Sequence, residues 1–296
     1  MKTNKMIKRL VHFSDLHIRL FKDHDLYRGI LNKMLEQFRE IKPCRIVFSG
    51  DLVHSKNTVS PELIEFVSWI LTECAKIAKT IVIIGNHDMI ESNLERLDTL
   101  TPIINSLNNP NICYYKDRGV YEDENINWCV YSLVQHNIPP EIPQNGKINI
   151  GLFHGPINGL KTDLGYSFGE ESFDSSKFNG LEITLCGDIH KRQIIYTESI
   201  IEINEELLDV YVIKGWEKVS GDVGKIKIKK QIPIIQVGST IQQNYGETIT
   251  KHGFGIYNLE SDEYSFVDLD NPKPFLSFKM KSFDDIINGT EKLVNN

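Results

Sequence analysis

Short apolar runs alternate with amphipathic stretches through the first third of the chain. Buried strands are predicted at residues 8–14, 45–48 and 80–84. Between them, residues 25–40 carry apolar side chains at helical spacing, which predicts a helix. Ser60 followed by Pro61 is typical of the N-cap and first residue of a second helix, and its pattern runs to Ala78. Strands that alternate with helices in this way indicate a parallel sheet covered by helices.

The pattern changes after a further helix predicted at residues 94–107. Short β-like pieces then favour a second, antiparallel-leaning sheet, at residues 112–115, 119–121 and 128–133. Longer buried strands follow at residues 148–153 and 183–186. The predicted fold class is α/β: two mixed sheets packed face to face and flanked by helices, a four-layer α/β-β/α sandwich.

This sandwich is expected to span residues 1–270 as one domain. A β-rich segment at residues 196–232, with a period-two run of lysines, indicates an inserted hairpin or small β unit. Strand character returns at residues 233–237 and 252–257. Residues 271–296 are expected to hold an exit strand (Pro272 to Met280) and the start of a truncated capping region.

Polar side chains follow the predicted strands at the points where they end. The clusters are Asp15 with His17, Asp51 with His54, Asn86 with His87 and Asp88, His154 alone, and Asp188 with His190. Taken singly, each cluster is an ordinary strand-end turn or a structural histidine. Their joint occurrence favours a site, because ligands of open α/β sheets bind beyond the carboxyl ends of the strands.

The ligand types in these clusters indicate which ions would bind. Carboxylate, amide and imidazole groups suit Mn²⁺, Fe²⁺ or Zn²⁺, and no thiolate is present to favour zinc alone. The candidates outnumber the ligands that one ion needs. The sequence therefore predicts two divalent cations bridged by a carboxylate, an arrangement suited to in-line phosphoryl displacement.

The net charge and the cysteine content exclude some classes of protein and indicate the cellular compartment. The chain of 296 residues has a formal net charge of -7, which excludes a protein that coats nucleic acid by bulk charge. Its five cysteines are scattered without C-x-x-C spacing, which favours a reducing compartment over a disulfide framework. Because no signal-peptide core or membrane-length apolar run occurs, we expect a soluble, intracellular protein with no membrane partner.

The ordered motifs resemble those of the calcineurin-like metallophosphoesterase superfamily, over roughly residues 8–258 apart from the insert. Within it, three segments are similar to the SbcD-type nuclease subunit of double-strand-break repair complexes, as found in bacteria and phages. These segments are Gly50-Asp51-Leu52-Val53-His54, Phe153-His154-Gly155-Pro156 and Gly238-Ser239.

The resemblance implies a role for each cluster. Asp15, His17 and His190 would hold one metal ion, Asn86, His154 and Asp188 would hold the other, and Asp51 would bridge them. His87 would contact the scissile phosphate and help protonate the leaving oxygen, with Asp88 fixing its tautomer. His54 would position phosphate or DNA near the leaving group.

Asp188 departs from the pattern of many family members, which have Gly-His-x-His where this chain has Gly187-Asp188-Ile189-His190. A carboxylate still ligates Mn²⁺, but it adds negative charge and weakens the Lewis acidity of that ion. The prediction is retained activity with a shifted metal preference.

The resemblance implies a metal-dependent DNA nuclease with 3′-to-5′ exonuclease and endonuclease activity. Mn²⁺ is the expected metal, with Mg²⁺, Fe²⁺ and Zn²⁺ as alternatives. Such subunits work in DNA repair and recombination with an SbcC-type coiled-coil ATPase, often as homodimers, in the cytoplasm (the host cytoplasm for a phage protein). Two alternatives stay open: a general phosphatase of small phosphate esters, and a catalytically inactive scaffold of the same fold.

Other features of the sequence carry weaker expectations. His12, His24, His136 and His252 lack a strand-end context, so we expect structural or surface roles, with His12 packed inside the first strand. The alternating lysines Lys225, Lys227 and Lys229 either track phosphates or protect an edge strand by charge, and the second interpretation is favoured. The Gly238-Ser239 turn and residues Gln242 to Glu247 fit an ordinary loop, but the resemblance implies that this segment lies near the rim of the site, on the substrate side.

Overall fold

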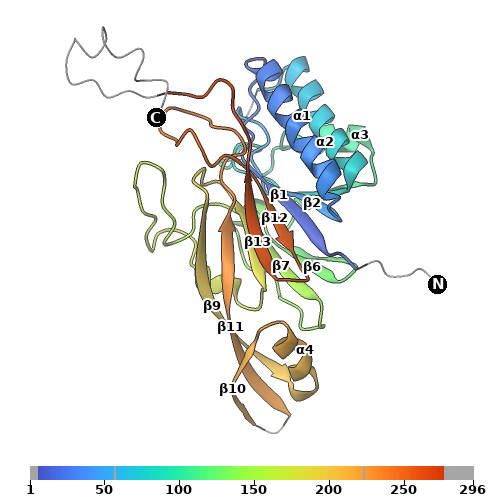
Figure 1. Cartoon of the computed structure of the whole chain (residues 1–296), viewed down its shortest axis with the longest axis vertical. Helices are drawn as coiled ribbons and strands as arrows, with labels where there is room; N and C mark the ends of the chain where they lie inside the picture. The colour runs from blue at the N-terminus through green and yellow to red at the C-terminus, as the bar shows by residue number, and fades with distance from the viewer. Residues whose placement is uncertain (1–5, 57, 223, 277–296) are drawn as a thin grey trace.

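Two β-sheets packed face to face form the centre of the protein (Figure 1). The structure, a computed structural model, describes residues 6–56, 58–222 and 224–276. The first sheet has the strand order β13-β12-β1-β2-β3-β4, and the second has the order β10-β11-β8-β7-β6-β5 with β9 paired to β11. Both sheets are mixed and helices pack against the first, so the predicted fold class is confirmed.

The strands of the first sheet are β1 (Arg9–Phe13), β2 (Arg45–Phe48), β3 (Lys79–Val82), β4 (Ile112–Tyr114), β12 (Gly253–Asn258) and β13 (Glu263–Asp268). Those of the second are β5 (Gly119–Asp123), β6 (Ile126–Tyr131), β7 (Ile148–His154), β8 (Ile183–Gly187), β9 (Gln193–Asn204), β10 (Glu217–Asp222) and β11 (Lys225–Gln236). The helices are α1 (His24–Ile41), α2 (Pro61–Ile77), α3 (Leu100–Leu107) and α4 (Leu208–Ile213), with 3₁₀ turns η1 (Leu133–Gln135), η2 (Ser175–Phe178) and η3 (Glu205–Leu207).

The apolar runs of the first sheet are explained by burial on both faces. In β2, Ile46 and Phe48 pack toward the helices α1 to α3, while Val47 faces the second sheet. Successive side chains of a strand point to opposite faces, so a strand covered on both sides is apolar at every position. The predicted start of α2 is confirmed, because the Ser60 hydroxyl accepts a hydrogen bond from the backbone N–H of Leu63 at 3.1 Å.

Two predictions about the sheets and helices are wrong in detail. β4 belongs to the first sheet, parallel to β3, and β6, β7 and β8 run parallel in the second sheet, which is therefore less antiparallel than expected. The helix predicted from residue 94 begins at Leu100. Asp98 accounts for this start: its buried carboxylate accepts from the Thr101 backbone N–H at 2.7 Å and from the Tyr114 hydroxyl at 3.0 Å, which ties the helix to β4.

The outer face of the second sheet is covered by the loop that follows β7 and by η2. Aromatic side chains fill this layer, with Phe153 and Phe178 ring centroids 5.4 Å apart and Tyr131 close to both. The fourth layer is thus a loop with a 3₁₀ turn, where the sequence predicted a helical layer.

The insert forms an extension of β9, β10 and β11 that projects from the second sheet, with α4 packed on it (Figure 1). Its small core is made by Ile203 of β9, Tyr211 of α4, Ile228 of β11 and Trp216, which directly precedes β10. The pieces predicted separately at 225–230 and 233–237 are largely one strand, β11. Pro233 fits inside it because it falls after the last partner from β10 and before the first from β8, at Ile234.

The lysines of β11 do not lie on an edge strand. β11 is the middle strand of the extension, between β9 and β10, so the edge-protection interpretation is wrong. The ammonium group of Lys225 lies 2.9 Å from the Glu202 carboxylate on the neighbouring strand. Acidic partners therefore already neutralise part of this face.

The sequence predicts an exit strand from Pro272 and a capping region in the C-terminal segment. Residues 271–276 form no strand, and the rest of this segment, residues 277–296, lies outside the described residues. No helix in the described part of the chain is long and apolar enough to cross a membrane.

Candidate metal centre

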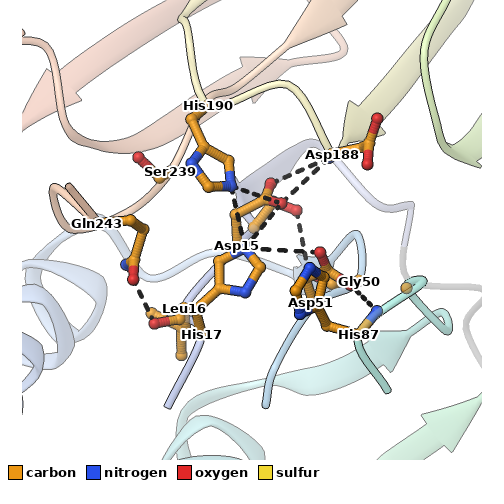
Figure 2. Close-up of polar contacts among 12 residues, drawn as sticks. Asp15, Leu16, His17, Gly50, Asp51, His87, Asp188, His190, Ser239 and Gln243 are labelled. Atoms are coloured by element: carbon orange, nitrogen blue, oxygen red, sulfur yellow. Dashed lines mark hydrogen bonds and ion pairs between the residues drawn. The ribbon is translucent and has the colours of Figure 1, made fainter. Parts of the chain in front are cut away.

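The polar clusters that follow five strands meet at one rim of the two sheets. Asp15 and His17 follow β1, Asp51 follows β2, Asn86 follows β3, His154 ends β7, and Asp188 with His190 follows β8. Figure 2 shows the side chains of Asp15, His17, Asp51 and His190 directed toward one another. The structure thus brings together six of the seven residues that the sequence proposed as metal ligands: Asp15, His17, Asp51, His154, Asp188 and His190. The seventh, Asn86, has a buried side-chain oxygen.

The backbone is strained at four of these positions. Asp15, His17, Asp51 and Asp188 have positive φ angles of 54°, 45°, 60° and 94°. Non-glycine residues adopt this region at a cost, and such outliers cluster at functional sites. Gly85 shows why the motifs contain glycine, because a Cβ atom there would lie 2.2 Å from the backbone nitrogen of Asp51.

The first ligand group consists of Asp15, His17 and His190. The Nε2 atoms of the two histidines lie 3.0 Å apart, and each lies 3.8 Å from Oδ1 of Asp15. Asp15 and His17 are buried and His190 is partly buried. Two imidazole nitrogens and a carboxylate oxygen that converge in this way form a donor set for a divalent cation.

The second group is built around His154. Its Nδ1 lies 2.7 Å from the Ser49 carbonyl oxygen, which only accepts, so Nδ1 carries a proton and Nε2 is the ring nitrogen left to face a cation. Nε2 lies 3.3 Å from Oδ1 of Asp51, and among the described residues neither Nε2 nor the buried Oδ1 of Asn86 has a hydrogen-bond partner. Buried polar atoms left without partners are costly, so these two fit a bound cation.

Asp51 connects the two groups. Its Oδ2 lies 3.5 Å from His17 Nε2, and its Oδ1 faces His154 Nε2. Oδ1 also accepts a hydrogen bond from the backbone N–H of His87 at 2.7 Å. One carboxylate therefore presents a different oxygen to each group, as a bridging ligand requires.

These geometric findings agree with comparisons with known proteins. Residues 8–192 match the family model of the calcineurin-like phosphoesterases. The chain belongs to this family. Its members hydrolyse phosphate esters with the help of bound metal ions, and the donor set described above fits such ions.

Two individual proteins are also similar to the chain. Over 288 residues, 93% of this chain, it is 31% identical to the uncharacterized protein R555 of Acanthamoeba polyphaga mimivirus, and it spans 19% of the length of that protein. The crystal structure of a dimetal phosphatase from Danio rerio superposes with a TM-score of 0.47 at 9% identity, covering 91% of this chain and 98% of that one.

Asp188 presents its backbone to the first donor group and its side chain to the second. Its backbone N–H points at Asp15, with 3.2 Å to either carboxylate oxygen, and its own carboxylate lies on the far side (Figure 2). Asp188 Oδ1 lies 3.8 Å from His154 Nε2. That Asp188 is a metal ligand of the second donor group stays a prediction.

Charge in the metal-free site is balanced by two histidines. Burial opposes a charged imidazole, but the neighbouring Asp51 raises the pKa of His154 well above its usual value. For His190, burial is likewise opposed by the hydrogen bond to Glu247 and the charge of Asp15, which raise its pKa to about 9. These imidazolium groups supply positive charge to a buried carboxylate cluster, a role that bound cations take over.

His87 and His54 stand at the open side of the centre. Nδ1 of His87 lies 2.8 Å from the backbone carbonyl oxygen of His54, which fixes its proton on that atom and leaves Nε2 for other contacts. The two histidines line a pocket of about 250 Å³ together with Arg19 and several of the metal-site residues. His17, His54 and His87 also lie close enough to form a third donor set, so the catalytic roles of His54 and His87 stay predictions.

The role expected for Asp88 is wrong. Its carboxylate accepts from the backbone N–H groups of Asp51, Leu52, Val53 and Gly85, at 2.9 to 3.1 Å. The proton of His87 Nδ1 goes to the His54 carbonyl instead. Asp88 therefore holds the turn that carries the bridging Asp51, and it does not orient the imidazole of His87.

Sequence reasoning missed Glu247. The segment from Gly238 to Glu247 was expected on the substrate side of the rim, but the Glu247 carboxylate contacts the metal-site residue His190 at 2.7 Å. No motif spacing links two residues that lie 57 positions apart, and only the fold brings them together. By contrast, the structural role predicted for His12 is confirmed: it is fully buried between Ser49 and Tyr264, and burial lowers its pKa to about 3.

Proposed function

We propose that this family member is a metal-dependent DNA nuclease of the SbcD type, with 3′-to-5′ exonuclease and endonuclease activity. The observation that carries the proposal is the position of Asp51, whose two oxygens face His17 and His154, one in each donor group. A carboxylate shared in this way supports a pair of cations, and phosphodiester hydrolysis is a reaction that such pairs promote.

The residues of the site divide the work of this reaction. Asp15, His17, His190 and Asp51 would hold one ion, and Asp51, Asn86, His154 and Asp188 would hold the other. When bound, the ions supply Lewis acidity and lower the pKa of water. His87 contacts the scissile phosphate, and its Nε2, which faces away from the His54 carbonyl, delivers a proton to the leaving oxygen.

The surroundings of the site favour a polymeric substrate. A second pocket, of about 240 Å³, adjoins the first, and the two share Asp188, His190 and Asn244. Leu164 lines the second pocket and is 83% exposed, and Tyr245, which lies in the chain between the lining residues Asn244 and Gly246, is 66% exposed. Exposed apolar and aromatic side chains beside a phosphate site suit the faces of nucleic-acid bases.

Residues on both sides of the scissile phosphate could thus contact a strand. Arg19 lines the first pocket and offers a positive charge to a neighbouring phosphate, and Lys191 does so in the second. Such local contacts are compatible with a net charge of -7.

The proposal also includes a protein partner and a cellular location. We expect the protein to work with an SbcC-type coiled-coil ATPase and to form homodimers, in the cytoplasm or, for a phage protein, in that of the host. ATP-dependent stimulation of DNA cleavage by an added ATPase of this type would support the partnership, whereas unchanged rates with a confirmed complex would contradict it.

The test of the proposed function uses purified protein with Mn²⁺, and with Mg²⁺, Fe²⁺ or Zn²⁺ in its place. Substrates are end-labelled single- and double-stranded DNA, p-nitrophenyl phosphate and bis(p-nitrophenyl) phosphate. We expect stepwise shortening from 3′ ends, lost in a His87→Ala control. Hydrolysis of p-nitrophenyl phosphate with intact DNA would establish a general phosphatase instead. Bound Mn²⁺ without cleavage of any substrate would establish a scaffold.

A further inference from the structure

Glu247 holds the outer nitrogen of a metal-site histidine. Its Oε1 lies 2.7 Å from Nδ1 of His190, while Nε2 of the same ring faces His17 and Asp15. The Glu247 side chain is only 6% exposed, so solvent does not weaken this contact. The two nitrogens of His190 thus have different tasks, because one donates to Glu247 and the other faces the metal centre.

The remaining bonds of Glu247 fix its orientation. Oε2 accepts from the Gln243 backbone N–H at 2.9 Å and from the Ser239 hydroxyl at 3.1 Å. Oε1 also accepts from the side-chain amide of Asn244 at 2.8 Å. A carboxylate with partners on both oxygens cannot rotate without breaking them, so it presents a fixed acceptor to His190.

The loop that carries Glu247 also holds the backbone of the first donor group. The Ser239 N–H donates to the His190 carbonyl at 3.1 Å, and the Thr240 N–H donates to the Ser14 carbonyl, directly before Asp15. The Gln243 side chain donates to the Leu16 carbonyl at 3.2 Å (Figure 2). Among the described residues, hydrogen bonds from this loop reach the first donor group and do not reach His154 or Asn86.

We propose that Glu247 is the positioning residue of the first metal ion. By accepting the Nδ1 proton of His190, it selects the tautomer whose Nε2 lone pair is available, orients the ring and increases its basicity as a ligand. Because the hydrogen bonds from this loop, among the described residues, reach only the first donor group, the loss of Glu247 should weaken the binding of one ion and leave that of the other unchanged. The inference depends on the metal pair of the proposed function, and it does not depend on DNA as the substrate.

The experiment is a titration of metal-free protein with Mn²⁺, in which electron paramagnetic resonance measures the free ion. The wild type should bind two ions. Glu247→Ala should bind one of them about 10- to 100-fold more weakly and leave the other unchanged. Glu247→Gln keeps an oxygen that accepts from Nδ1, so it should bind that ion more tightly than Glu247→Ala. Thermal unfolding of each metal-free variant checks that it is folded.

The matched control is Gln242→Ala, which perturbs the same loop elsewhere. The Gln242 side chain bonds to both backbone groups of Phe275 and donates to the backbone carbonyl of Glu247 at 3.2 Å. Among the described residues it makes no hydrogen bond to the Glu247 carboxylate or to His190, so the variant perturbs the loop and leaves the bond between these two side chains in place. This variant should bind both ions as the wild type does. If Glu247→Ala bound both Mn²⁺ ions with wild-type affinity, the inference would be overturned. It would also be overturned if Gln242→Ala lost as much Mn²⁺ affinity as Glu247→Ala, because the loss would then come from the packing of the loop. A wild-type protein that binds no Mn²⁺ would overturn this inference and the proposed function, whereas inactivity on DNA with two bound ions would overturn the proposed function alone.

Discussion

The Nε2 atoms of His17 and His190 lie 3.0 Å apart, although 173 positions separate the two residues in the chain. One residue follows the first strand of the first sheet and the other follows β8 of the second sheet. The metal centre is therefore assembled across the boundary between the sheets. Its geometry depends on how the sheets pack as much as on either motif.

Removal of the charge on Asp51 should disable both donor groups at once. Asp51→Asn leaves one neutral oxygen where two charged ones faced His17 and His154. We expect a fall in kcat of at least about 100-fold and loss of tight binding of both Mn²⁺ ions. Glu260→Gln, which changes an exposed carboxylate paired with Lys8, is the control and should match the wild type. Tight binding of two ions by Asp51→Asn would contradict the bridging role.

Loss of His87 should reduce turnover without loss of metal. His87→Ala removes a proton donor at the open side of the site, and general acid catalysis contributes about 10²- to 10⁴-fold. The reduction should be large for DNA, whose leaving alkoxide needs a proton, and small for bis(p-nitrophenyl) phosphate, whose leaving group does not. Equal reductions for both substrates would argue against the proton-donor role.

The pH dependence of Mn²⁺ binding should report the loss of a proton from His190. Its pKa is raised to about 9, so in the metal-free protein the imidazole is charged below that pH and must lose a proton when the ion binds. The number of protons released on binding should therefore fall by about one as pH rises through 9. Calorimetry in buffers of different ionisation enthalpy measures this number, and a constant value from pH 7 to pH 10 would contradict the assignment.

The same shift makes a prediction for stability without metal. The folded pKa of His190 lies above its unfolded value, so the charged form stabilises the metal-free fold fully below about pH 6.5. This contribution is lost as pH rises through 9. In Glu247→Ala the corresponding decline in the free energy of unfolding should be smaller and should occur at lower pH, as urea titrations can show.

Asp88 should matter for stability as well as for catalysis. Asp88→Asn places an amide N–H₂ among four backbone N–H donors, so at least one buried donor loses its acceptor. Such a loss costs about 1 to 3 kcal/mol of the free energy of unfolding, measurable by urea titration. His87→Ala is the comparison, because a change at that more exposed site should stay within about 0.5 kcal/mol. Equal stabilities of the two variants would contradict the role of Asp88 in holding the turn that carries Asp51.

Asp188 should set the metal preference. Asp188→His introduces the imidazole of the common family pattern, which should shift the preference from Mn²⁺ toward Zn²⁺, since imidazole suits zinc and carboxylate suits manganese. Asp188→Asn should lower the affinity for one ion. If Asp188→Asn left metal content and rate unchanged, Asp188 would not be a ligand.

The sequence predicted the strand ends well for a physical reason. Parallel strands buried on both faces are apolar at every position, so the polar residues after β1, β2 and β3 stand out, and the fold requires them to share one rim. Local signals also located the start of α2 at Ser60 and Pro61.

What the sequence missed depends on contacts between distant segments. The carboxylates of Asp88 and Glu247 take partners that no local spacing indicates, because backbone amides and ring nitrogens from other loops leave no mark on the sequence. For the same reason β11 was divided into two pieces at Pro233, since the local rule against proline in strands ignores where the neighbouring strands end. The edge-strand interpretation of Lys225 failed because pairing on both sides of β11 is a tertiary property.

β11 runs without a turn from the tip of the extension to Gln236, and Gly238 follows two residues later, at the beginning of the loop that clamps His190. The extension and the loop that bonds to His190 are therefore consecutive in the chain, and only Val237 separates β11 from Gly238. A displacement of the extension along β11 would therefore be passed directly to the segment that bonds to the His190 backbone.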